Sequence, residues 1–224
     1  MIPNTLVAQK METIQSIFRE VQESYSGKTQ LNNYDIEFRG IAYEAASMNI
    51  ALHDFKNHNE LKDWYKFLSE KGTLQATQIH VGLGWALAQN EIDTSTILPN
   101  LEPMMRYRVL DGYGYYEGIF RKRKSILSQQ KPAFKDTVAS SAYDQGLGRS
   151  LWYLNNGKID EAKHALEKFS VERHKNLWRG LGIAITYAGG CDEAALQEIL
   201  TKAGQYKTQL ATGCIMATIS RFNA

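Results

Sequence analysis

The chain has 224 residues, of which 43% are hydrophobic and 22% charged, and its formal net charge is +2. This length and composition fit one globular domain with a hydrophobic core and argue against a disordered chain. The weak net charge does not indicate the clustered, strongly basic face that nucleic-acid binding usually needs, so we expect no nucleic-acid partner.

Two further features bear on the cellular location. The two cysteines, Cys191 and Cys214, are too few for a disulfide scaffold. The N-terminal residues show no basic stretch followed by an apolar core, and no apolar run approaches the roughly 20 residues that a membrane helix needs. We therefore expect a cytoplasmic protein without a membrane span.

The first predicted element in chain order is an amphipathic helix over residues 5–26. Apolar residues recur along it at spacings of three and four, which places them on one face of a helix. A polar loop over residues 28–33 follows. Residues 1–33 are thus predicted to form an N-terminal helix and loop, and residues 34–224 a helical repeat domain.

The repeat is indicated by six similar small-residue motifs, most of the form Gly-x-Gly. Their first glycines are separated by 30 to 42 residues, which is near the length of one helical pair in repeat proteins. We predict an all-α fold of about six helical hairpins, either a tetratricopeptide-like solenoid or a closed α/α ring. The motifs are Arg39-Gly40-Ile41-Ala42, Val81-Gly82-Leu83-Gly84, Asp111-Gly112-Tyr113-Gly114, Gln145-Gly146-Leu147-Gly148, Arg179-Gly180-Leu181-Gly182 and Thr212-Gly213-Cys214-Ile215.

Short amphipathic helices are predicted between the motifs. Gly72 is expected to end the helix over residues 59–71. Asp192 is expected to cap the start of the helix over residues 192–203, and Gly204 is expected to end it. The region 92–132 contains prolines and the shortest motif spacing, so its second helix should be abbreviated. The three short helices are predicted over residues 59–71, 159–169 and 192–203.

The glycines themselves need a physical reason, because glycine inside a helix costs roughly 1 kcal/mol relative to alanine. One reason is packing, since helices without side chains at these points can approach closely. The other is function, since small residues can open a cavity or let a ligand approach the backbone. The two reasons can hold together.

Acids, arginines and aromatic residues adjoin the glycines, a mixture that suits a pocket with apolar walls and a few polar groups. Buried carboxylates can have raised pKa values and act as general acids. The alternative is that these acids pair with nearby arginines and tie neighbouring helices together. The candidate catalytic residues are Asp111, Glu117, Glu44, Asp144 and His80, and the candidate substrate-binding residues are Arg39, Trp85, Tyr113, Tyr116, Arg149 and Arg179.

We expect no metal and no cofactor. His53 and His58 resemble a metal-binding pair only by their spacing, and phosphate-binding and nucleophile-elbow motifs are absent from the sequence. The one basic run, Arg121-Lys122-Arg123-Lys124, fits a solvated helix end. It could instead hold a diphosphate or an acidic carrier domain.

Several strings of this sequence resemble an uncharacterised bacterial family found in enediyne and other specialised-metabolite gene clusters. The resemblance runs in order from residue 38 to residue 222. It implies a role in natural-product biosynthesis and supplies no reaction. The strings are Arg39-Gly40-Ile41-Ala42-Tyr43-Glu44, Ile79-His80-Val81-Gly82-Leu83-Gly84-Trp85-Ala86-Leu87-Ala88, Leu110-Asp111-Gly112-Tyr113-Gly114, Glu117-Gly118, Asp144-Gln145-Gly146-Leu147-Gly148-Arg149-Ser150-Leu151-Trp152 and Tyr187-Ala188-Gly189-Gly190.

Together, the residues and the resemblance lead to the hypothesis of an accessory biosynthetic enzyme, an isomerase or cyclase. It would bind an apolar small-molecule intermediate, a polyene or an isoprenoid, with Asp111 or Glu117 as the acid. The alternative is a non-catalytic helical-repeat scaffold or carrier that docks a synthase or a carrier protein.

Overall fold

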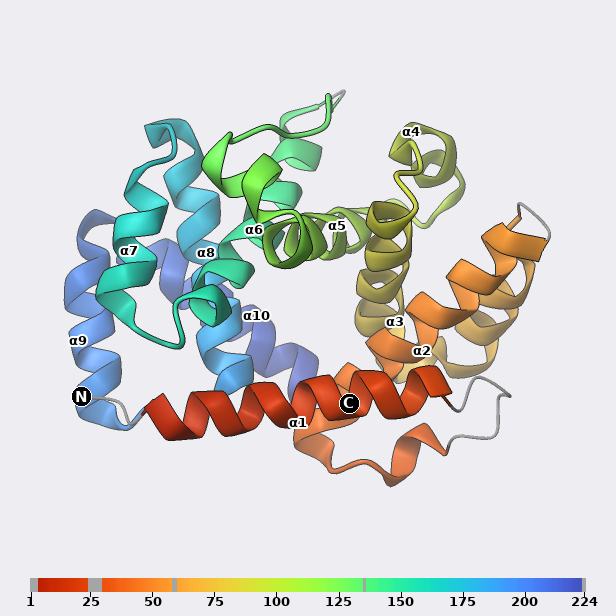
Figure 1. Cartoon of the computed structure of the whole chain (residues 1–224), viewed down its shortest axis with the longest axis horizontal. Helices are drawn as coiled ribbons and strands as arrows, with labels where there is room; N and C mark the ends of the chain where they lie inside the picture. Colours follow the sequence, from red (N-terminus) through yellow and green to blue (C-terminus); the bar gives the residue numbers. More distant parts are fainter. Residues whose placement is uncertain (1–3, 24–29, 58–59, 135, 223–224) are drawn as a thin grey trace. The chain divides into compact units, whose positions relative to one another are not determined.

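The computed structural model describes residues 4–23, 30–57, 60–134 and 136–222 (Figure 1). These residues form helices and no strand, which confirms the predicted all-α class. The chain divides into two compact units. Unit 1 comprises Met1–Glu12 and Gly114–Ile219, and unit 2 comprises Thr13–Tyr113 and Ser220–Ala224.

Ten α-helices are present in the described residues, together with four short helical turns. None of the described helices combines the length and the hydropathy needed to cross a bilayer. The α-helices are α1 (Asn4–Glu23), α2 (Ile36–Asn57), α3 (Lys62–Gln89), α4 (Thr94–Ile97), α5 (Arg106–Phe120), α6 (Thr137–Leu154), α7 (Ile159–Glu167), α8 (Val171–Ala188), α9 (Glu193–Ala203) and α10 (Lys207–Phe222). The turns are η1 (Leu31–Asn33), η2 (Leu98–Asn100), the π-helix η3 (Arg123–Leu127) and η4 (Gly204–Tyr206).

Unit 2 is built on an antiparallel hairpin of α2 and α3, whose backbones touch (Figure 1). A methyl group on Gly82 of α3 would lie 2.2 Å from the carbonyl oxygen of Glu44 on α2. In the reverse direction, the hydroxyl of Ser47 donates a hydrogen bond of 2.5 Å to the carbonyl of Ile79. A small residue on each helix therefore meets the backbone of the other.

Unit 1 repeats this kind of contact between α6 and α8. A methyl group on Gly148 of α6 would lie 2.2 Å from the carbonyl oxygen of Leu177, and one on Gly180 of α8 would lie 1.9 Å from that of Gln145. Real Cβ atoms do not approach other atoms so closely. Glycine is thus required for the observed helix separation, because any side chain would push the two helices apart.

The Gly-x-Gly spacing has a simple geometric meaning on α8. Residues two apart on a helix point about 200° apart, which is close to opposite faces. A methyl group on Gly180 would meet α6, whereas one on Gly182 would lie 2.1 Å from the carbonyl oxygen of Leu210 on α10. The motif therefore lets α8 touch a neighbouring helix on either side. The packing role predicted for these glycines is confirmed here.

One expected contact position and one expected helix boundary are wrong. The small-residue contact of α2 lies at Ser47 and not at Gly40, where an added methyl group would meet only the side chain of Gln78, at 3.1 Å. The helix predicted over residues 59–71 does not end at Gly72, because α3 continues without interruption to Gln89. Gly72 is not among the glycines with positive φ, so it gives the chain no reason to leave the helix.

The other local signals hold. The carboxylate of Asp192 accepts a hydrogen bond of 2.8 Å from the backbone N–H of Ala195 and so caps α9. Gly204, with φ of 55°, ends that helix in the conformation that glycine adopts most easily. In the proline-containing region, the second helix is indeed abbreviated to the single turn α4 and η2.

Candidate functional site

Unit 1 contains a buried polar network at the point where α5, η3, α6 and α8 meet. We define it as Glu117 on α5, Lys124 on η3, Tyr143 and Asp144 on α6, and Arg173 on α8. Glu117 and Tyr143 are 0% exposed, and Asp144 is 2% exposed. Burying these groups is costly unless each finds a partner, so their contacts define what the site can do.

Three donors converge on the Glu117 carboxylate. The phenol of Tyr143 donates a hydrogen bond of 2.6 Å to Oε2. The ammonium of Lys124 lies 3.3 Å from Oε1, and the guanidinium of Arg121, the residue after α5, lies 3.8 Å from the same oxygen. Glu117 therefore lies between a neutral proton donor and two cations.

The π-helix η3 is what brings Lys124 to this carboxylate. Its wider turn follows directly after α5, and the hydroxyl of Ser125 donates a hydrogen bond of 2.9 Å back to the carbonyl of Glu117. Lys124 is half-exposed, with 44% of its side chain accessible, although its partner is fully buried. Its ammonium therefore links the network to the surface. π-Helical turns are rare and occur often at functional sites.

Burial, the negative charge of Glu117 and the hydrogen bond to it raise the pKa of Tyr143 far above its usual value. The phenol thus stays protonated at every physiological pH. Tyr143 and Glu117 together form a donor–acceptor pair that is shielded from water.

Asp144 and Arg173 form the second half of the network. The Nε and Nη2 atoms of Arg173 lie 3.0 Å and 2.5 Å from Oδ1 of Asp144. Lys131 lies 4.0 Å from the other oxygen, Oδ2. The Arg173 guanidinium also lies over the ring of Phe169, 4.7 Å from its centre, which adds a cation–π contact.

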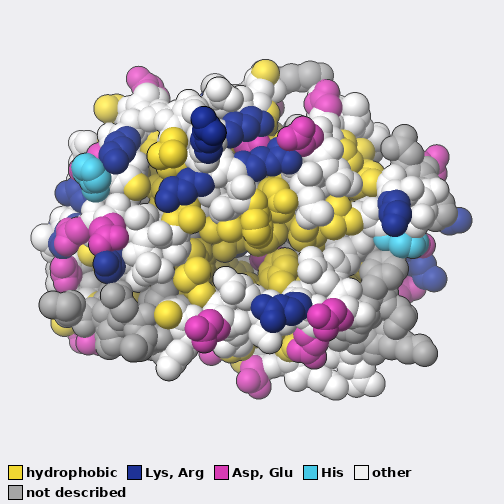
Figure 2. All heavy atoms as spheres, in the orientation of Figure 1, with side chains coloured by type: hydrophobic (Ala, Val, Ile, Leu, Met, Phe, Trp, Pro, Cys, Tyr) yellow, Lys and Arg dark blue, Asp and Glu magenta, His cyan; other side chains and the backbone are white. Residues whose placement is uncertain are grey.

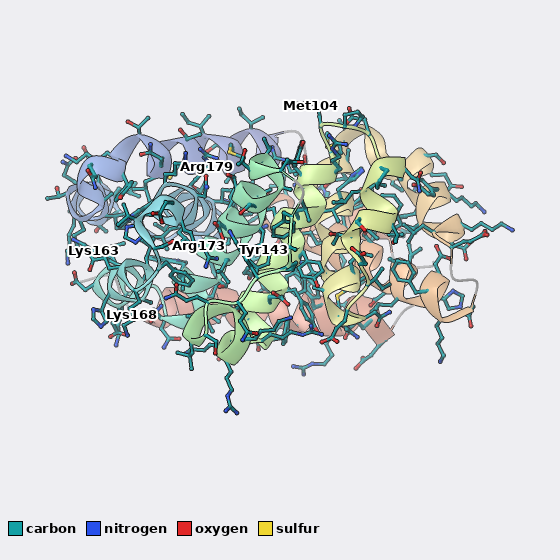
Figure 3. All side chains as sticks on the ribbon, turned by 90° about the horizontal axis from the view of Figure 1, so that it is seen from above. Met104, Tyr143, Lys163, Lys168, Arg173 and Arg179 are labelled. Carbon is teal, nitrogen blue, oxygen red and sulfur yellow. The ribbon has the colours of Figure 1, made fainter. Side chains whose placement is uncertain are left out.

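Aromatic rings pack against several polar side chains of unit 1. The ring of Phe134 lies 5.4 Å from that of Tyr143, and the guanidinium of Arg149 lies 4.6 Å from the ring centre of Tyr115. In Figure 3 the labelled side chains of Tyr143 and Arg173 lie inside unit 1, whereas Lys163 and Lys168 lie at its edge. The network is therefore largely interior, with aromatic rings packed beside Tyr143 and Arg173.

A basic surface adjoins the network. Lys122 and Arg123 are exposed, and Lys124 extends from the same run toward Glu117. Figure 2 shows dark blue side chains gathered in the upper part of this face, over the end of α5 and η3. The basic run predicted as a solvated helix end is thus exposed on one side and bound to a buried acid on the other.

The five predicted catalytic residues divide between the two units. Glu117 and Asp144 lie in unit 1, and the structure places both in the buried polar network. Glu44, His80 and Asp111 lie in unit 2, where they are 3%, 2% and 2% exposed. All five are thus interior residues.

His80 has a distinct environment in unit 2. Its Nδ1 lies 2.7 Å from the carbonyl of Ala76, one turn earlier on α3, and its ring packs edge-on against Trp64. Burial lowers the pKa of His80, against weaker opposing effects from the Ala76 carbonyl and Glu102. Its buried Nε2 has no hydrogen-bond partner among the residues that the structure describes. A neutral ring with Nδ1–H bound to the carbonyl leaves Nε2 as an acceptor.

The predicted substrate-binding residues are mainly aromatic and arginine side chains at partly buried positions. In unit 2, Trp85 is 7% exposed and stacks on Phe18 of α1 with 4.9 Å between ring centres, and Tyr113 is 6% exposed. Arg39 of the same unit is half-buried. In unit 1, Arg149 is 7% exposed, whereas Tyr116 and Arg179 are half-buried.

The sequence analysis missed two central residues, Tyr143 and Arg173. A signal existed for the first, because Tyr143 precedes Asp144 just as tyrosines precede Glu44 and Glu117. No comparable signal marked Arg173, which lies in a charged stretch typical of a surface helix. Its neighbour His174, which looks like a surface residue in the sequence, is only 8% exposed. The arginine that pairs with Asp144 is Arg173, a residue outside the predicted set.

Fold and site together define an all-helical protein with a tyrosine–glutamate pair and an ion pair buried side by side in one unit. The chain belongs to the family described as "Protein of unknown function (DUF1702)", which it matches over residues 7–224. Comparison with curated proteins and with solved structures gave no match.

Proposed function

We propose that this protein is an accessory enzyme of specialised-metabolite biosynthesis, acting in the cytoplasm as an isomerase or cyclase. Its substrate is an apolar unsaturated intermediate, a polyene or an isoprenoid. The observation that carries the proposal is the 2.6 Å hydrogen bond between Tyr143 and Glu117 in a fully buried setting. The biosynthetic context rests on the resemblance of the sequence strings to a family from such gene clusters.

The reaction class follows from what the pair can do with a proton. Moving a double bond along a polyene adds a proton at one carbon and removes another proton from a second carbon, so no co-reactant is consumed. In the proposed mechanism, the Tyr143 phenol delivers a proton and the Glu117 carboxylate accepts one. The two groups already share a hydrogen bond, so the proton can return to Tyr143 after each turnover.

The remaining groups control charge and water. Lys124 and Arg121 balance the negative charge of Glu117, and Arg173 balances that of Asp144. An aromatic face such as that of Phe134, which packs against Tyr143, can stabilise positive charge that develops on the substrate during proton transfer. Exclusion of water keeps that charge from being captured.

The experiment replaces the gene, in the strain that carries it, with variants and profiles the metabolites by mass spectrometry. In the Glu117→Gln variant we expect the end product to disappear and an intermediate to accumulate. When purified wild-type protein is added, this intermediate should be converted to a product of identical mass. The Tyr143→Phe variant should show the same loss. Glu161→Gln, at an exposed position of α7, is the matched control and should keep the product.

Purified variants must first be shown to be folded, by circular dichroism and size-exclusion chromatography. A folded Glu117→Gln variant that still yields the end product would overturn the catalytic role of the pair.

A second candidate function is a non-catalytic helical-repeat scaffold or carrier. It is supported by the ion pair of Asp144 with Arg173 and by the basic surface at Lys122 and Arg123, which suits an acidic carrier protein. In this case the folded Glu117→Gln variant keeps the pathway output. A Lys122→Glu, Arg123→Glu variant loses the output and also fails to retain the carrier in a pull-down.

A further inference from the structure

Three side chains of metal-ligand type meet at one end of the α2–α3 hairpin in unit 2. His53 and Asp54 lie near the end of α2, and Asp63 lies in the first turn of α3. One ligand atom from each residue, a ring nitrogen and two carboxylate oxygens, lies within 4.8 Å of the other two. The hairpin therefore brings Asp63 close to two residues of the preceding helix that lie nine and ten positions earlier in the sequence.

Asp54 supplies an independent reason to expect a ligand here. Its side chain is 0% exposed, and its Oδ2 accepts a hydrogen bond of 2.9 Å from the backbone N–H of Trp64. Its other oxygen, Oδ1, is buried and has no hydrogen-bond partner among the described residues. A buried carboxylate oxygen without a partner is costly, and a bound cation would remove that cost.

A purely structural role accounts for only part of this arrangement. Asp54 anchors the first turn of α3, since Leu61 at the cap position has no side chain that could accept a hydrogen bond. That contact uses Oδ2 and leaves Oδ1 unexplained. It also does not explain why ligand atoms of Asp63 and His53 lie within 4.8 Å of Asp54.

We propose that His53, Asp54 and Asp63 bind one divalent transition-metal ion of the Zn²⁺, Mn²⁺ or Fe²⁺ class. A neutral imidazole and two carboxylates together carry two negative charges, which match a divalent cation. The nitrogen ligand favours these ions over Ca²⁺ and Mg²⁺, which prefer oxygen alone. In a tetrahedral zinc site neighbouring ligand atoms lie roughly 3.4 Å apart, so a small movement of the side chains closes the site.

The position in the fold gives the ion a defined task. It joins the last turns of α2 to the first turn of α3 and so fastens the hairpin that carries Glu44 and His80. Three protein ligands leave at least one coordination position for water or another small ligand. This site does not depend on the function proposed for the network of unit 1.

The test uses the full chain, stripped with a chelator and then dialysed separately against Zn²⁺ and Mn²⁺. Elemental analysis should find one equivalent of metal per chain, and the metal should raise the melting temperature. Removing a residue that hydrogen-bonds to a metal ligand commonly weakens metal binding by about 10- to 100-fold. Removing a ligand itself should weaken metal binding at least as much. We therefore expect Asp63→Asn and His53→Gln to bind no stoichiometric metal.

Asp63→Asn is the decisive variant because Asp63 is less buried than Asp54, so the change should leave the fold intact. Asp160→Asn, at an exposed position of α7, is the matched control and should bind metal as the wild type does. The proposal is overturned if the wild type retains no metal, or if folded Asp63→Asn binds the same amount with the same affinity.

Discussion

The phenol of Tyr143 on α6 and the carboxylate of Glu117 on α5 meet at 2.6 Å, and neither side chain is exposed to solvent. Tyr143 is followed directly by Asp144, which binds Arg173 on α8. Adjacent residues of α6 therefore contact two neighbouring helices by different means. Tyr143 donates a hydrogen bond to α5 as a neutral phenol, whereas Asp144 forms an ion pair with α8. Substitutions at the two positions should have distinguishable effects.

Replacing Tyr143 with phenylalanine should change how stability depends on pH. The pKa of Tyr143 lies near 10.0 in the unfolded chain and much higher in the folded protein. Above about pH 10 the unfolded chain therefore loses a proton that the folded protein keeps, and stability falls by up to about 1.4 kcal/mol per pH unit. The Tyr143→Phe variant lacks this dependence, so its curve should be flatter there.

Urea unfolding of both proteins between about pH 7 and about pH 11 measures this difference. At pH 7 the variant should be less stable by about 1–3 kcal/mol, because Glu117 loses one donor. If the stabilities of the wild type and of Tyr143→Phe change in parallel above pH 10, then the Tyr143 phenol loses its proton equally in the folded and unfolded states.

The ion pair of Asp144 and Arg173 should be costly to break from one side only. Either Asp144→Leu or Arg173→Met alone leaves a buried charge unpaired and should destabilise the protein by about 3–5 kcal/mol. The double variant leaves neither charge and should be less destabilised than the sum of the two single variants. A double-mutant cycle by urea unfolding measures this coupling.

The exposed pair of Lys158 and Glu161 serves as the control for that cycle, because its side chains are 46% and 51% exposed. Its coupling should stay below about 1 kcal/mol. Equal coupling in the two cycles would contradict the assignment of the first pair as buried and mutually dependent.

Two glycines of α3 should respond differently to substitution by alanine. The added methyl group of Gly84→Ala would lie 2.0 Å from the carbonyl oxygen of Val109, and a backbone atom cannot rotate away. We expect a loss of about 3 kcal/mol in the free energy of unfolding. Gly72→Ala would meet only the flexible end of Leu68, at 2.9 Å.

The Gly72→Ala variant should therefore be as stable as the wild type or more stable by up to about 1 kcal/mol, since alanine favours the helix. Urea midpoints followed by circular dichroism compare the two variants directly. Similar midpoints for both would refute the backbone contact between α3 and α5.

His80 should make the protein sensitive to acid. Burial lowers the pKa of His80 below its ordinary value of 6.5. As the pH falls through about 6.5, the unfolded chain binds a proton that the folded protein does not, so stability is lost by up to about 1.4 kcal/mol per pH unit. The His80→Gln variant should lose less stability between neutral pH and about pH 5.

Thermal or urea unfolding across this pH range is the measurement, and His164→Gln, at an exposed position of α7, is the control. The control curve should follow that of the wild type. If His80→Gln also follows the wild type, His80 is protonated to the same extent in the folded and unfolded states.

The sequence predicted the features that depend on local chemistry. The all-α class, the cap at Asp192, the stop at Gly204 and the abbreviated helix near α4 follow from signals within a few residues of each other. The position of the first small-residue contact, on α2, could not be predicted from glycine alone, because no glycine lies there. Ser47 serves there instead, since its hydroxyl turns a close approach to a carbonyl into a hydrogen bond.

The site was predictable only where an acid adjoins a motif. Glu117 and Asp144 could be selected in this way, and the structure places both in one network. Arg173 and Lys124 could not, because which cation reaches a buried acid depends on the packing of α8 and on the π-turn of η3. Long side chains in charged stretches look alike in a sequence, whether they enter the interior or remain in water.

The glycine contacts restrict how this protein can recover from mutation. Where two side chains clash, a smaller neighbour can restore the fit, so second-site suppressors are common. At Gly148 and Gly180 the opposing atoms are carbonyl oxygens of Leu177 and Gln145, and every amino acid carries that oxygen. No single substitution in the opposing helix can compensate for a larger residue here. A genetic screen starting from Gly148→Ala should therefore return reversions to glycine rather than suppressors at Leu177.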